Sequence, residues 1–411
     1  MVAAAATRLR VDTIAAGGDG VGRSDGLAVF VPRTAPGDVV DVALDVRGRY
    51  ARGSVVRLVE PSDLRVTPPC VHYTRDRCGG CQLQHLAYEA QLAAKRAIVR
   101  EAVRRIGRRD VADVDVRPSP SPWRYRTKLT LALRRRGGRW VAGLHPYDDP
   151  DAVFQLEQCL ITHDHVVAVW RDIFDAAELL PSARSLRGAV RLVPEGAAFV
   201  LEGGTHWPSA AAFADRVQEL RAIWWEPTGS RRRLVVDRRK AASPDASFAQ
   251  VNPAAAALMH DHVVTTTLTY APRTVIDAYA GAGATALALA ERGVEVTAVE
   301  LDPAAARWAS SHLPPRSRAI VARVEDVLAT LLPADVVILN PPRAGVDERV
   351  TRTLQESGAP RAIVYVSCNP ATLARDLARL PRYRIASMTS FDLFPQTAHV
   401  ETVCTLVPEA A

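Results

Sequence analysis

The sequence predicts an α/β protein in three parts: a small N-terminal β-barrel, an α+β middle domain and a C-terminal doubly wound α/β domain. Short β-prone runs between glycine and proline turns fill residues 8–59. Strand-like and helix-like segments mix from residue 123 to about residue 243, and strands then alternate with helices from residue 248. A chain of 411 residues with 48% hydrophobic residues is long enough for two or three such domains.

The N-terminal part is expected to be a five-stranded, oligonucleotide-binding-like barrel. Its β-prone runs are LRVDTI, GLAVFV, DVVDVALDV and RGSVVRLV, and turn residues such as GGDG and PGD separate them. Short strands at such regular spacing are typical of small barrels. Two functions stay open for it, an oligonucleotide-binding module and an accessory barrel that improves solubility. The first is favoured by arginines in its later half, namely Arg47, Arg49, Arg52 and Arg57.

The middle domain begins with a cysteine-rich segment and an amphipathic helix. The run YEAQLAAKRAIVREAVRRIG predicts a helix over residues 88–107, a segment able to pack on the C-terminal domain. A proline-rich linker follows, and RTKLTLALRRR, RWVAGLH and AVRLVPEGAAFVLEG then predict strands. The expected domain boundaries are residues 1–62, 63–245 and 246–411.

The C-terminal domain opens with a nucleotide-binding pattern, VIDAYAGAGATALALAERGVEVTAVELD. It predicts a strand, a glycine turn, a helix and a second strand that ends in an acid. Gly281 and Gly283 let the backbone approach a nucleotide, and Glu300 is placed to bind ribose hydroxyls. The same letters satisfy the dinucleotide motif G-x-G-x-x-A. This stretch alone therefore leaves both NAD and S-adenosylmethionine open as cofactors.

Two further strands of this domain end in polar motifs. VVILNPPRAG puts Asn340 at the end of one strand, and IVYVSCNPA puts Cys368 at the end of another. Asn369 and Pro370 predict the N-cap and first residue of a helix directly after Cys368. A helix N-terminus stabilises a thiolate and lowers a cysteine pKa, so Cys368 is a candidate nucleophile. The alternative for this cysteine alone is a small apolar residue that fills a gap.

Four other cysteines predict a metal centre. CVHYTRDRCGGCQLQH contains three of them, and LEQCLI supplies a distant fourth: Cys70, Cys78, Cys81 and Cys159. Six cysteines in so long a chain do not suggest a disulfide framework. Four thiolates hold either zinc or an iron–sulfur cluster, and spacing does not separate the two. Cys159 has the alternative of being a free cysteine, and Cys404 is assigned to the core.

The overall charge and hydropathy limit the partners. A net charge of +7 favours a polyanionic partner, although arginine-rich usage alone also produces such a balance. No apolar run reaches the length of a membrane span, and the first residues do not form a signal peptide. We therefore expect a cytoplasmic protein with no membrane partner and no obligate protein partner.

The motifs DAYAGAG, NPPR, SCNPATLARD and FDLFPQTAHVE occur together in this chain. This set resembles the RNA 5-methyluridine methyltransferases, an S-adenosylmethionine-dependent family that acts on tRNA or 23S rRNA. GGDGVG, VFVPRTAPGD and PSDLRVTPPC look like the TRAM barrel of several members, so the resemblance covers nearly the whole chain. It implies a C-terminal class I methyltransferase domain with a Rossmann-like fold, RNA as substrate and a [4Fe–4S] cluster at the four cysteines. The barrel and the cysteines together look more like the 23S rRNA branch than the tRNA branch.

The resemblance also assigns roles to residues. Cys368 matches the nucleophile and Glu401 the general base, while the cofactor-binding positions are matched by Gln250, Tyr279, Glu300 and Asn340. Two positions depart from the pattern: Asn340 stands where many members have aspartate, and Ala284 where many have asparagine. The second departure implies that one side-chain contact to the cofactor is absent or supplied elsewhere.

Uridine chemistry fits these residues. C5 of uracil is a poor nucleophile, so a thiolate first adds to C6, and a base finally removes the C5 proton. The resemblance further implies uridine rather than cytosine, because related cytosine-5 enzymes carry a second cysteine in the Pro-Pro region and this chain has none there. Arg343 stands where amino-methylating enzymes have an aromatic residue. The alternatives are an NAD-dependent dehydrogenase and a non-catalytic RNA-binding or assembly factor with a methyltransferase fold.

Overall fold

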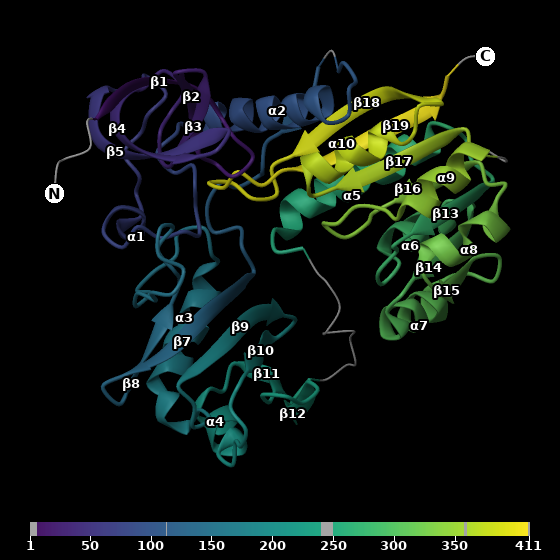
Figure 1. Cartoon of the computed structure of the whole chain (residues 1–411). Coiled ribbons are helices and arrows are strands. Elements are labelled where there is room, and N and C mark those ends of the chain that lie inside the picture. The colour runs from purple at the N-terminus through teal and green to yellow at the C-terminus, as the bar shows by residue number, and fades with distance from the viewer. Residues whose placement is uncertain (1–5, 112, 240–249, 357–359, 410–411) are drawn as a thin grey trace.

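The computed structural model describes residues 6–111, 113–239, 250–356 and 360–409. Strands in these residues form a closed five-stranded barrel, a six-stranded sheet and an eight-stranded sheet. Figure 1 shows the barrel and the eight-stranded sheet near opposite ends of helix α2 (Tyr88–Arg105), with the six-stranded sheet below them. The predicted fold class is confirmed. The expected boundary near residue 245 lies outside the described residues.

The N-terminal barrel has the strand order β1-β2-β3-β5-β4. Its strands are β1 (Thr7–Ile14), β2 (Gly20–Ser24), β3 (Leu27–Val31), β4 (Val39–Arg47) and β5 (Tyr50–Glu60). Alternate residues point inward, so that Leu9, Val11 and Val29 are buried in the barrel core. A Cβ atom at Gly22 would lie 2.2 Å from the carbonyl oxygen of Arg10, so glycine at this position allows β1 and β2 to pair closely.

The six-stranded sheet has the order β12-β11-β10-β9-β7-β8. Its strands are β7 (Lys128–Arg136), β8 (Arg139–Gly143), β9 (Ser185–Val193), β10 (Gly196–Glu202), β11 (Leu220–Glu226) and β12 (Arg233–Asp237). Helices α3 (Asp164–Asp175) and α4 (Ala210–Arg216) pack on this sheet, where Trp170, Phe199 and Phe213 form one aromatic cluster. The middle domain is therefore an α+β unit with its own core.

The eight-stranded sheet has the order β15-β14-β13-β16-β17-β19-β18-β6. Its strands are β6 (Asp115–Arg117), β13 (Thr274–Ala278), β14 (Glu295–Glu300), β15 (Arg318–Val321), β16 (Val336–Leu339), β17 (Ala362–Ser367), β18 (Tyr383–Phe391) and β19 (Glu401–Pro408). The strands from β15 to β17 pair in parallel, whereas β19 runs antiparallel to both β17 and β18. The short β6 comes from the segment before the middle domain and pairs with β18.

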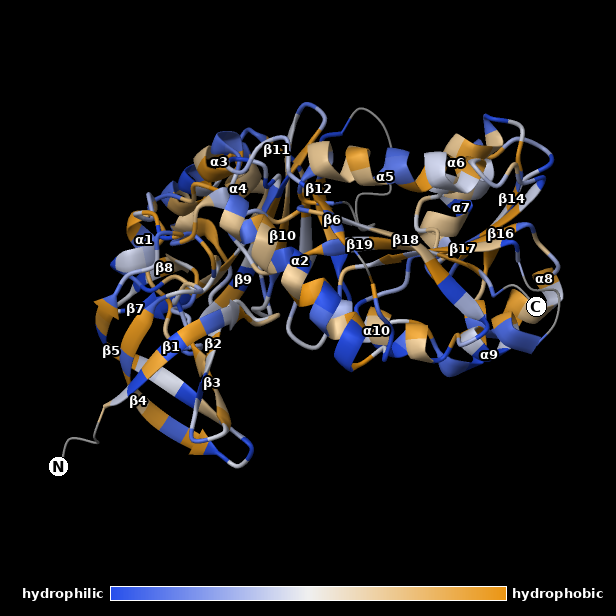
Figure 2. Ribbon diagram, turned by 90° about the horizontal axis from the view of Figure 1, so that it is seen from above, coloured by the Kyte–Doolittle hydropathy of each residue, from blue (hydrophilic) through white to orange (hydrophobic). Residues whose placement is uncertain are grey.

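Helices cover both faces of this sheet. They are α5 (Pro253–Leu268), α6 (Ala284–Ala290), α7 (Pro303–His312), α8 (Val324–Leu331), α9 (Glu348–Glu356) and α10 (Pro370–Ala378). Figure 2 shows α5 and α6 on one side of β16–β18, and α9 and α10 on the other. α2 joins the second layer, where its residues share a hydrophobic core with α8, α9 and α10. No helix in the described parts of the chain is long and apolar enough to cross a membrane.

Three helices of the C-terminal domain begin with the same local signal. Asn252, Asp302 and Asn369 are N-caps whose side-chain oxygens accept hydrogen bonds from backbone N–H groups of the first turn, and a proline follows each of them. A short polar cap and a proline at the first helical position together favour a helix start. The predicted N-cap at Asn369 is confirmed, and it fixes where the strand containing Tyr365 gives way to α10.

Candidate active site

The carboxyl ends of the parallel strands gather the predicted site residues at one edge of the sheet. β13 pairs with β14 and β16, and β16 pairs with β17. Tyr279 follows β13, Glu300 ends β14, Asn340 follows β16 and Cys368 follows the last residue of β17. Open α/β sheets bind their ligands at this edge, so the fold puts these residues where a ligand is expected.

The glycine turn after β13 is held by Glu300. The Gly281 N–H donates to Glu300 Oε2 at 2.8 Å, and the Asp302 N–H donates to Glu300 Oε1 at 2.8 Å. Gly281 and Gly283 have φ angles of 56° and 80°, which glycine adopts without strain. A Cβ atom at Gly281 would meet nothing within 4 Å, whereas one at Gly283 would lie 2.7 Å from the Ala309 Cβ atom. The turn thus leaves room for a ligand at Gly281 and packs closely on α7 at Gly283.

Three other residues lie next to this glycine turn. Ala284 is the first residue of α6 and offers no side-chain hydrogen bond. Tyr279 has a φ of 63°, and burial raises the pKa of its hydroxyl. Sequence reasoning missed Asp277, which is only 2% exposed. Its Oδ2 atom has no hydrogen-bond partner among the described residues, and burial raises the pKa of its carboxyl to about 7. Its signal in the sequence was an acid inside an apolar strand.

Cys368 and Glu401 face each other across two paired strands. The β17–β19 register pairs Ser367 with Thr402, so its next step sets Cys368 opposite Glu401. Glu401 is the first residue of β19 and is only 6% exposed, while Cys368 is half-buried. The antiparallel insertion of β19 beside β17 therefore brings together two residues far apart in sequence.

Burial and neighbouring charges shift the pKa values of both groups. Burial raises the pKa of Cys368, and the Glu401 carboxylate raises it further, whereas Arg343 lowers it. This net shift is opposite to the one expected from the helix N-terminus alone, because loss of solvent outweighs it. Burial also raises the pKa of Glu401 to about 7, against the lowering effect of Arg343. Glu401 thus titrates near neutral pH, where a general base works best.

Arg343 is a functional residue that sequence reasoning did not assign. Its guanidinium lowers the pKa of Cys368, Glu401 and His399. Its backbone carbonyl accepts hydrogen bonds from the Asn369 side chain at 3.4 Å and the Thr372 hydroxyl at 3.2 Å. The loop after β16 is thereby tied to the start of α10. The available signal was the arginine of NPPR, noted only as the residue that replaces an aromatic.

Gln250 lies in the wall of a separate cavity of about 280 Å³ at the junction with the middle domain. The wall includes Lys128 at the start of β7, Arg191 on β9 and Pro253 at the start of α5. Burial lowers the pKa of Lys128, and nearby arginines lower it further. The side chains of Lys128 and Arg191 therefore bring two basic groups to one wall.

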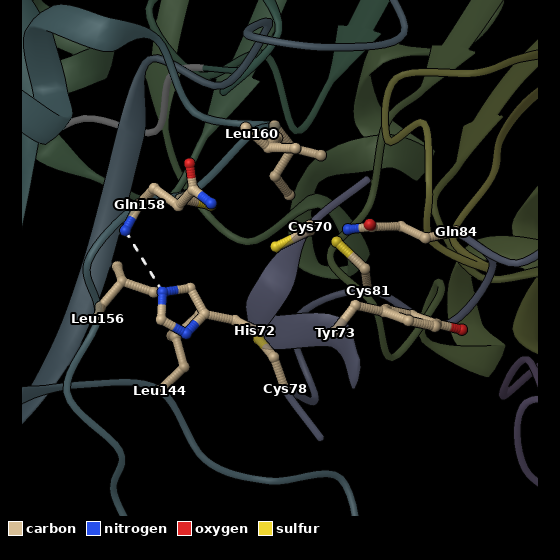
Figure 3. A pocket seen from close by; sticks show the side chains of 12 residues that line it. Cys70, His72, Tyr73, Cys78, Cys81, Gln84, Leu144, Leu156, Gln158 and Leu160 are labelled. Atoms are coloured by element: carbon tan, nitrogen blue, oxygen red, sulfur yellow. Dashed lines mark hydrogen bonds between the residues drawn. The ribbon is translucent and has the colours of Figure 1, made fainter. Parts of the chain in front are cut away.

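The four predicted metal cysteines line one small cavity of about 20 Å³ between the segment after the barrel and the middle domain. Figure 3 shows Cys70, Cys78 and Cys81 around it, beside His72 and Tyr73. Burial raises the pKa of Cys78 to about 11, and neighbouring thiols contribute to this shift. No group of three or more His, Cys, Asp or Glu residues in the described ranges is arranged to hold a metal ion. The cavity therefore unites the four cysteines without forming a closed site for one ion.

Two of these sulfurs already accept hydrogen bonds. The Gly80 N–H donates to Cys78 Sγ at 3.4 Å, and the Thr162 hydroxyl donates to Cys159 Sγ at 3.1 Å. Such donors stabilise thiolates, and they are common around sulfur ligands of metal clusters. Among the described residues all six cysteines are free thiols, so no disulfide competes for them. The donor set therefore fits a cluster chemically.

Together, the doubly wound sheet and its strand-end site define a protein of the methyltransferase fold class. The fold is similar to that of the Pyrococcus abyssi tRNA (uracil-54, C5)-methyltransferase in complex with S-adenosyl-L-homocysteine, with a TM-score of 0.72 and 24% identity. This similarity covers 97% of the present chain and 99% of the other. It extends over the barrel, the middle domain and the C-terminal domain alike.

Sequence comparisons then identify the family. Residues 315–408 match the family model of tRNA (Uracil-5-)-methyltransferase. An uncharacterized RNA methyltransferase of Thermosynechococcus vestitus is 34% identical over 98% of both chains, and one of Bacillus cereus is 32% identical over 94% of this chain and 93% of its own. The chain belongs to the family of these RNA methyltransferases and is an enzyme, and its C-terminal part matches the uracil-5-methyltransferase model. The resemblance noted in the sequence is confirmed at this level.

Proposed function

We propose that the protein transfers a methyl group from S-adenosylmethionine to C5 of a uridine in RNA, through a covalent adduct with Cys368. The observation behind this proposal is the pairing of Cys368 with Glu401 across β17 and β19, beside Arg343. One side of a flat uracil ring needs a nucleophile and the C5 proton needs a base. These two side chains supply both functions at one strand edge.

Cys368 opens the reaction. Its proton leaves, the sulfur bonds to C6 and the ring electrons move to C5 and O4. Arg343 favours the thiolate, whereas an ionised Glu401 disfavours it. Removing water when RNA covers the site would strengthen the attraction between Arg343 and the thiolate. Arg343 is therefore the residue that makes a half-buried cysteine usable as a nucleophile.

Glu401 closes the reaction. After C5 has gained its methyl group, the carboxylate takes the C5 proton, the C5–H electrons re-form the ring double bond and the C6–S bond breaks. The released thiolate restores Cys368. A carboxylate with a pKa near 7 is basic enough to accept this proton and is still largely ionised at slightly alkaline pH.

The strand-end residues fit a bound S-adenosylmethionine, which supplies an electrophilic methyl group. The open space at Gly281 would admit the cofactor, Glu300 would accept hydrogen bonds from its ribose, and Tyr279 and Asn340 would line its place. Gln250 would reach it only from the neighbouring cavity. The complex of the Pyrococcus abyssi enzyme with S-adenosyl-L-homocysteine supports this cofactor.

We also propose a [4Fe–4S] cluster at Cys70, Cys78, Cys81 and Cys159. Four cysteine sulfurs that bind one zinc ion each lie about 2.3 Å from the zinc, and the sulfurs are then roughly 3.8 Å from one another. A four-iron cluster holds its cysteine sulfurs further apart. The four cysteines that line one cavity would supply the four thiolates of the cluster, as the resemblance implies. Iron and acid-labile sulfide in anaerobically purified protein would support the cluster, and zinc without iron would contradict it.

RNA would contact all three domains. The barrel would serve as a TRAM-type RNA-binding module, and the Lys128 cavity would take a backbone phosphate near the flipped nucleotide. Lys128→Gln should then lower the slope of log binding constant against log salt concentration by roughly 0.7–0.9. Arg139→Gln, at the opposite end of the β7–β8 hairpin, is the matched control and should leave the slope unchanged. Equal slopes for all three proteins would remove Lys128 from the RNA surface.

We favour 23S rRNA as the substrate because the barrel and the cysteines resemble that branch. The second candidate is tRNA, which the family model and the Pyrococcus abyssi enzyme favour. The deciding experiment measures tritium release from transcripts of each RNA labelled at uridine C5, with S-adenosylmethionine. Release from one RNA class would name the substrate, and release from neither, with cofactor bound, would contradict C5 methylation.

A further inference from the structure

The loop that leads to Glu401 is bonded mainly to parts of the chain outside its own sheet. Residues 392–400 connect β18 to β19 and are called here the catalytic loop. Figure 1 shows this loop reaching away from the sheet towards α2 and the space between the barrel and the middle domain. Tyr125 donates its hydroxyl hydrogen bond to the Pro395 carbonyl at 3.0 Å, and Asn252 donates to the Leu393 carbonyl at 3.1 Å.

Gln396 stands at the centre of this loop and is only 3% exposed. Its carbonyl oxygen accepts hydrogen bonds from the N–H groups of Gln82 at 3.1 Å and Leu83 at 2.9 Å. Its own N–H donates to Gln91 Oε1, and its side-chain oxygen accepts from Gln91 Nε2, both at 2.9 Å. The first two partners belong to the cysteine loop, defined here as residues 75–87 between α1 (Val71–Thr74) and α2, and Gln91 lies in the first turns of α2. The Gln396 side chain also donates to the Pro122 carbonyl at 3.4 Å.

The backbone of Gln396 is in a conformation that its side chain disfavours. Its φ is 69°, in the left-handed region, which strains the backbone of a non-glycine residue. Such a conformation persists only where the surroundings determine it, and the four hydrogen bonds that Gln396 shares with Gln82, Leu83 and Gln91 do so here. Replacing Gln396 with glycine would relieve this backbone strain, but it would also remove the side-chain amide that bonds Gln91.

The segment between Gln396 and Glu401 is short and tightly packed. The Thr397 N–H and hydroxyl both bond the Phe394 carbonyl, at 3.2 and 2.8 Å, and the Thr397 hydroxyl accepts from the His399 N–H at 3.3 Å. Ala398 is buried against Leu83 and other residues of the cysteine loop and α2. A displacement of Gln396 would therefore be transmitted along this segment to Glu401.

We propose that Gln396 is the positioning residue that sets Glu401 against the C5 proton, and that the cysteine loop and α2 hold Gln396 in place. This inference rests on the proposed role of Glu401 as general base. Gln396 touches neither substrate nor cofactor in this scheme. Its effect falls on the last step of the reaction, because Cys368 lies between β17 and α10 and does not depend on the catalytic loop for its position.

This dependence predicts a distinctive intermediate. When Glu401 is misplaced, Cys368 still bonds to C6 and C5 still gains its methyl group, but the C5–H bond stays intact. The C6–S bond then has no means to break, so the methylated adduct persists. A variant at Gln396 should accumulate a covalent protein–RNA complex with ordinary uridine RNA, which a merely unstable enzyme would not do.

The test compares Gln396→Gly and Gln91→Ala with the wild type on the RNA transcript that releases tritium. We expect kcat for tritium release to fall roughly 10- to 100-fold with little change in KM, since small misplacements of a catalytic group cost about this much. The adduct with ordinary RNA should accumulate on denaturing gels in both variants. The double variant should be no slower than the worse single variant, because the two residues form one contact.

Ala271→Gly is the matched control. Ala271 follows α5 and has a φ of 42°, so glycine there relieves the same kind of backbone strain. Ala271 is exposed and lies at the end of the sheet that is remote from the strand-end site. Tritium release should stay at the wild-type rate in this variant. If the Gln396→Gly variant does not fold stably, Gln91→Ala still tests the inference. Gln91 lies in helix α2, and alanine favours a helix, so this variant should fold.

The outcomes separate the inference from the proposed function. Wild-type release rates in Gln91→Ala and Gln396→Gly, or slow release without any adduct, would overturn the role of Gln396. Wild-type release in Glu401→Gln would instead overturn the role of Glu401 itself. Loss of release in Glu401→Gln together with normal release in Gln396→Gly would leave the proposed function intact and refute the positioning inference alone.

Discussion

The protein places cysteines in two contrasting environments. Cys368 is half-buried, lies next to a helix N-terminus and has Arg343 beside it and Glu401 opposite. Cys78 and Cys81 are buried in a mostly apolar cavity, where desolvation raises the pKa of each thiol and the neighbouring thiols add to the shift. A nucleophile needs access and a nearby cation, whereas thiols packed together ionise only when a metal neutralises them. The surroundings, rather than the residue type, separate the two roles.

The largest expected effect comes from removing the accessible cysteine. Cys368→Ala should lower methyl transfer on the order of 10⁴-fold or more, since no other group forms the bond to C6. The variant should no longer form a stable complex with 5-fluorouridine RNA. Cys404→Ala, a core cysteine on β19, is the control and should keep activity while losing some stability. A 5-fluorouridine adduct in Cys368→Ala would remove the contrast between the two environments.

Removal of the cation beside Cys368 is expected to have the next largest effect. Arg343→Met takes away the charge that lowers the pKa of both Cys368 and Glu401, so both values should rise. We expect roughly a 10²-fold loss of kcat near pH 7. The acid limb of the pH–rate profile, near pH 7 in the wild type, should move to higher pH. An unshifted limb would show that Arg343 does not act on the base.

The stability of the protein should report the burial of Glu401. Its pKa rises from 4.5 in the unfolded chain to about 7 in the folded one, so the stabilisation is complete below pH 4.5 and is lost as pH rises through 7. Glu401→Gln should therefore gain more unfolding free energy at pH 8 than at pH 5, by about 3 kcal/mol at most. Denaturant unfolding at both pH values measures this difference, and an equal gain at both would contradict the shift.

The smallest expected effect concerns thiol reactivity. Iodoacetamide at pH 8 should modify Cys368 in the folded protein and leave Cys78 and Cys81 unmodified, because those two thiols are buried with a raised pKa, whereas Cys368 is half-buried beside Arg343. In Arg343→Met the rate at Cys368 should fall severalfold. Peptide mass spectrometry assigns the modified residues, and equal labelling of Cys81 and Cys368 would refute the comparison.

Much of the strand-end site was predictable because it depends on local pattern. A buried strand followed by a polar cap and a proline located Cys368, and a glycine turn followed by an acid located Glu300. The position of Glu401 opposite Cys368 was not predictable from such patterns, since it depends on the insertion of β19 between β17 and β18. The resemblance supplied its role, and only the strand register supplies its neighbour.

Long-range contacts escaped sequence reasoning for the same reason. The short β6 joins the C-terminal sheet although it precedes the middle domain, and three residues give a weak strand signal. The pair formed by Gln91 and Gln396 joins residues 305 positions apart, and nothing near either glutamine predicts the other. The expected lowering of the Cys368 pKa was wrong because burial, which sequence does not reveal, outweighs the helix N-terminus.

The same 305-residue separation has a consequence for protein synthesis. Gln82, Leu83 and Gln91 leave the ribosome long before Gln396 does, and they cannot form these hydrogen bonds until the last strands of the fold are made. Contacts between distant parts of a chain also form late in folding. Nascent chains that already have the barrel, the cysteines and Cys368 would thus remain without a positioned base. The enzyme would become competent to finish its reaction only after β19 has been made and has carried Glu401 to its place.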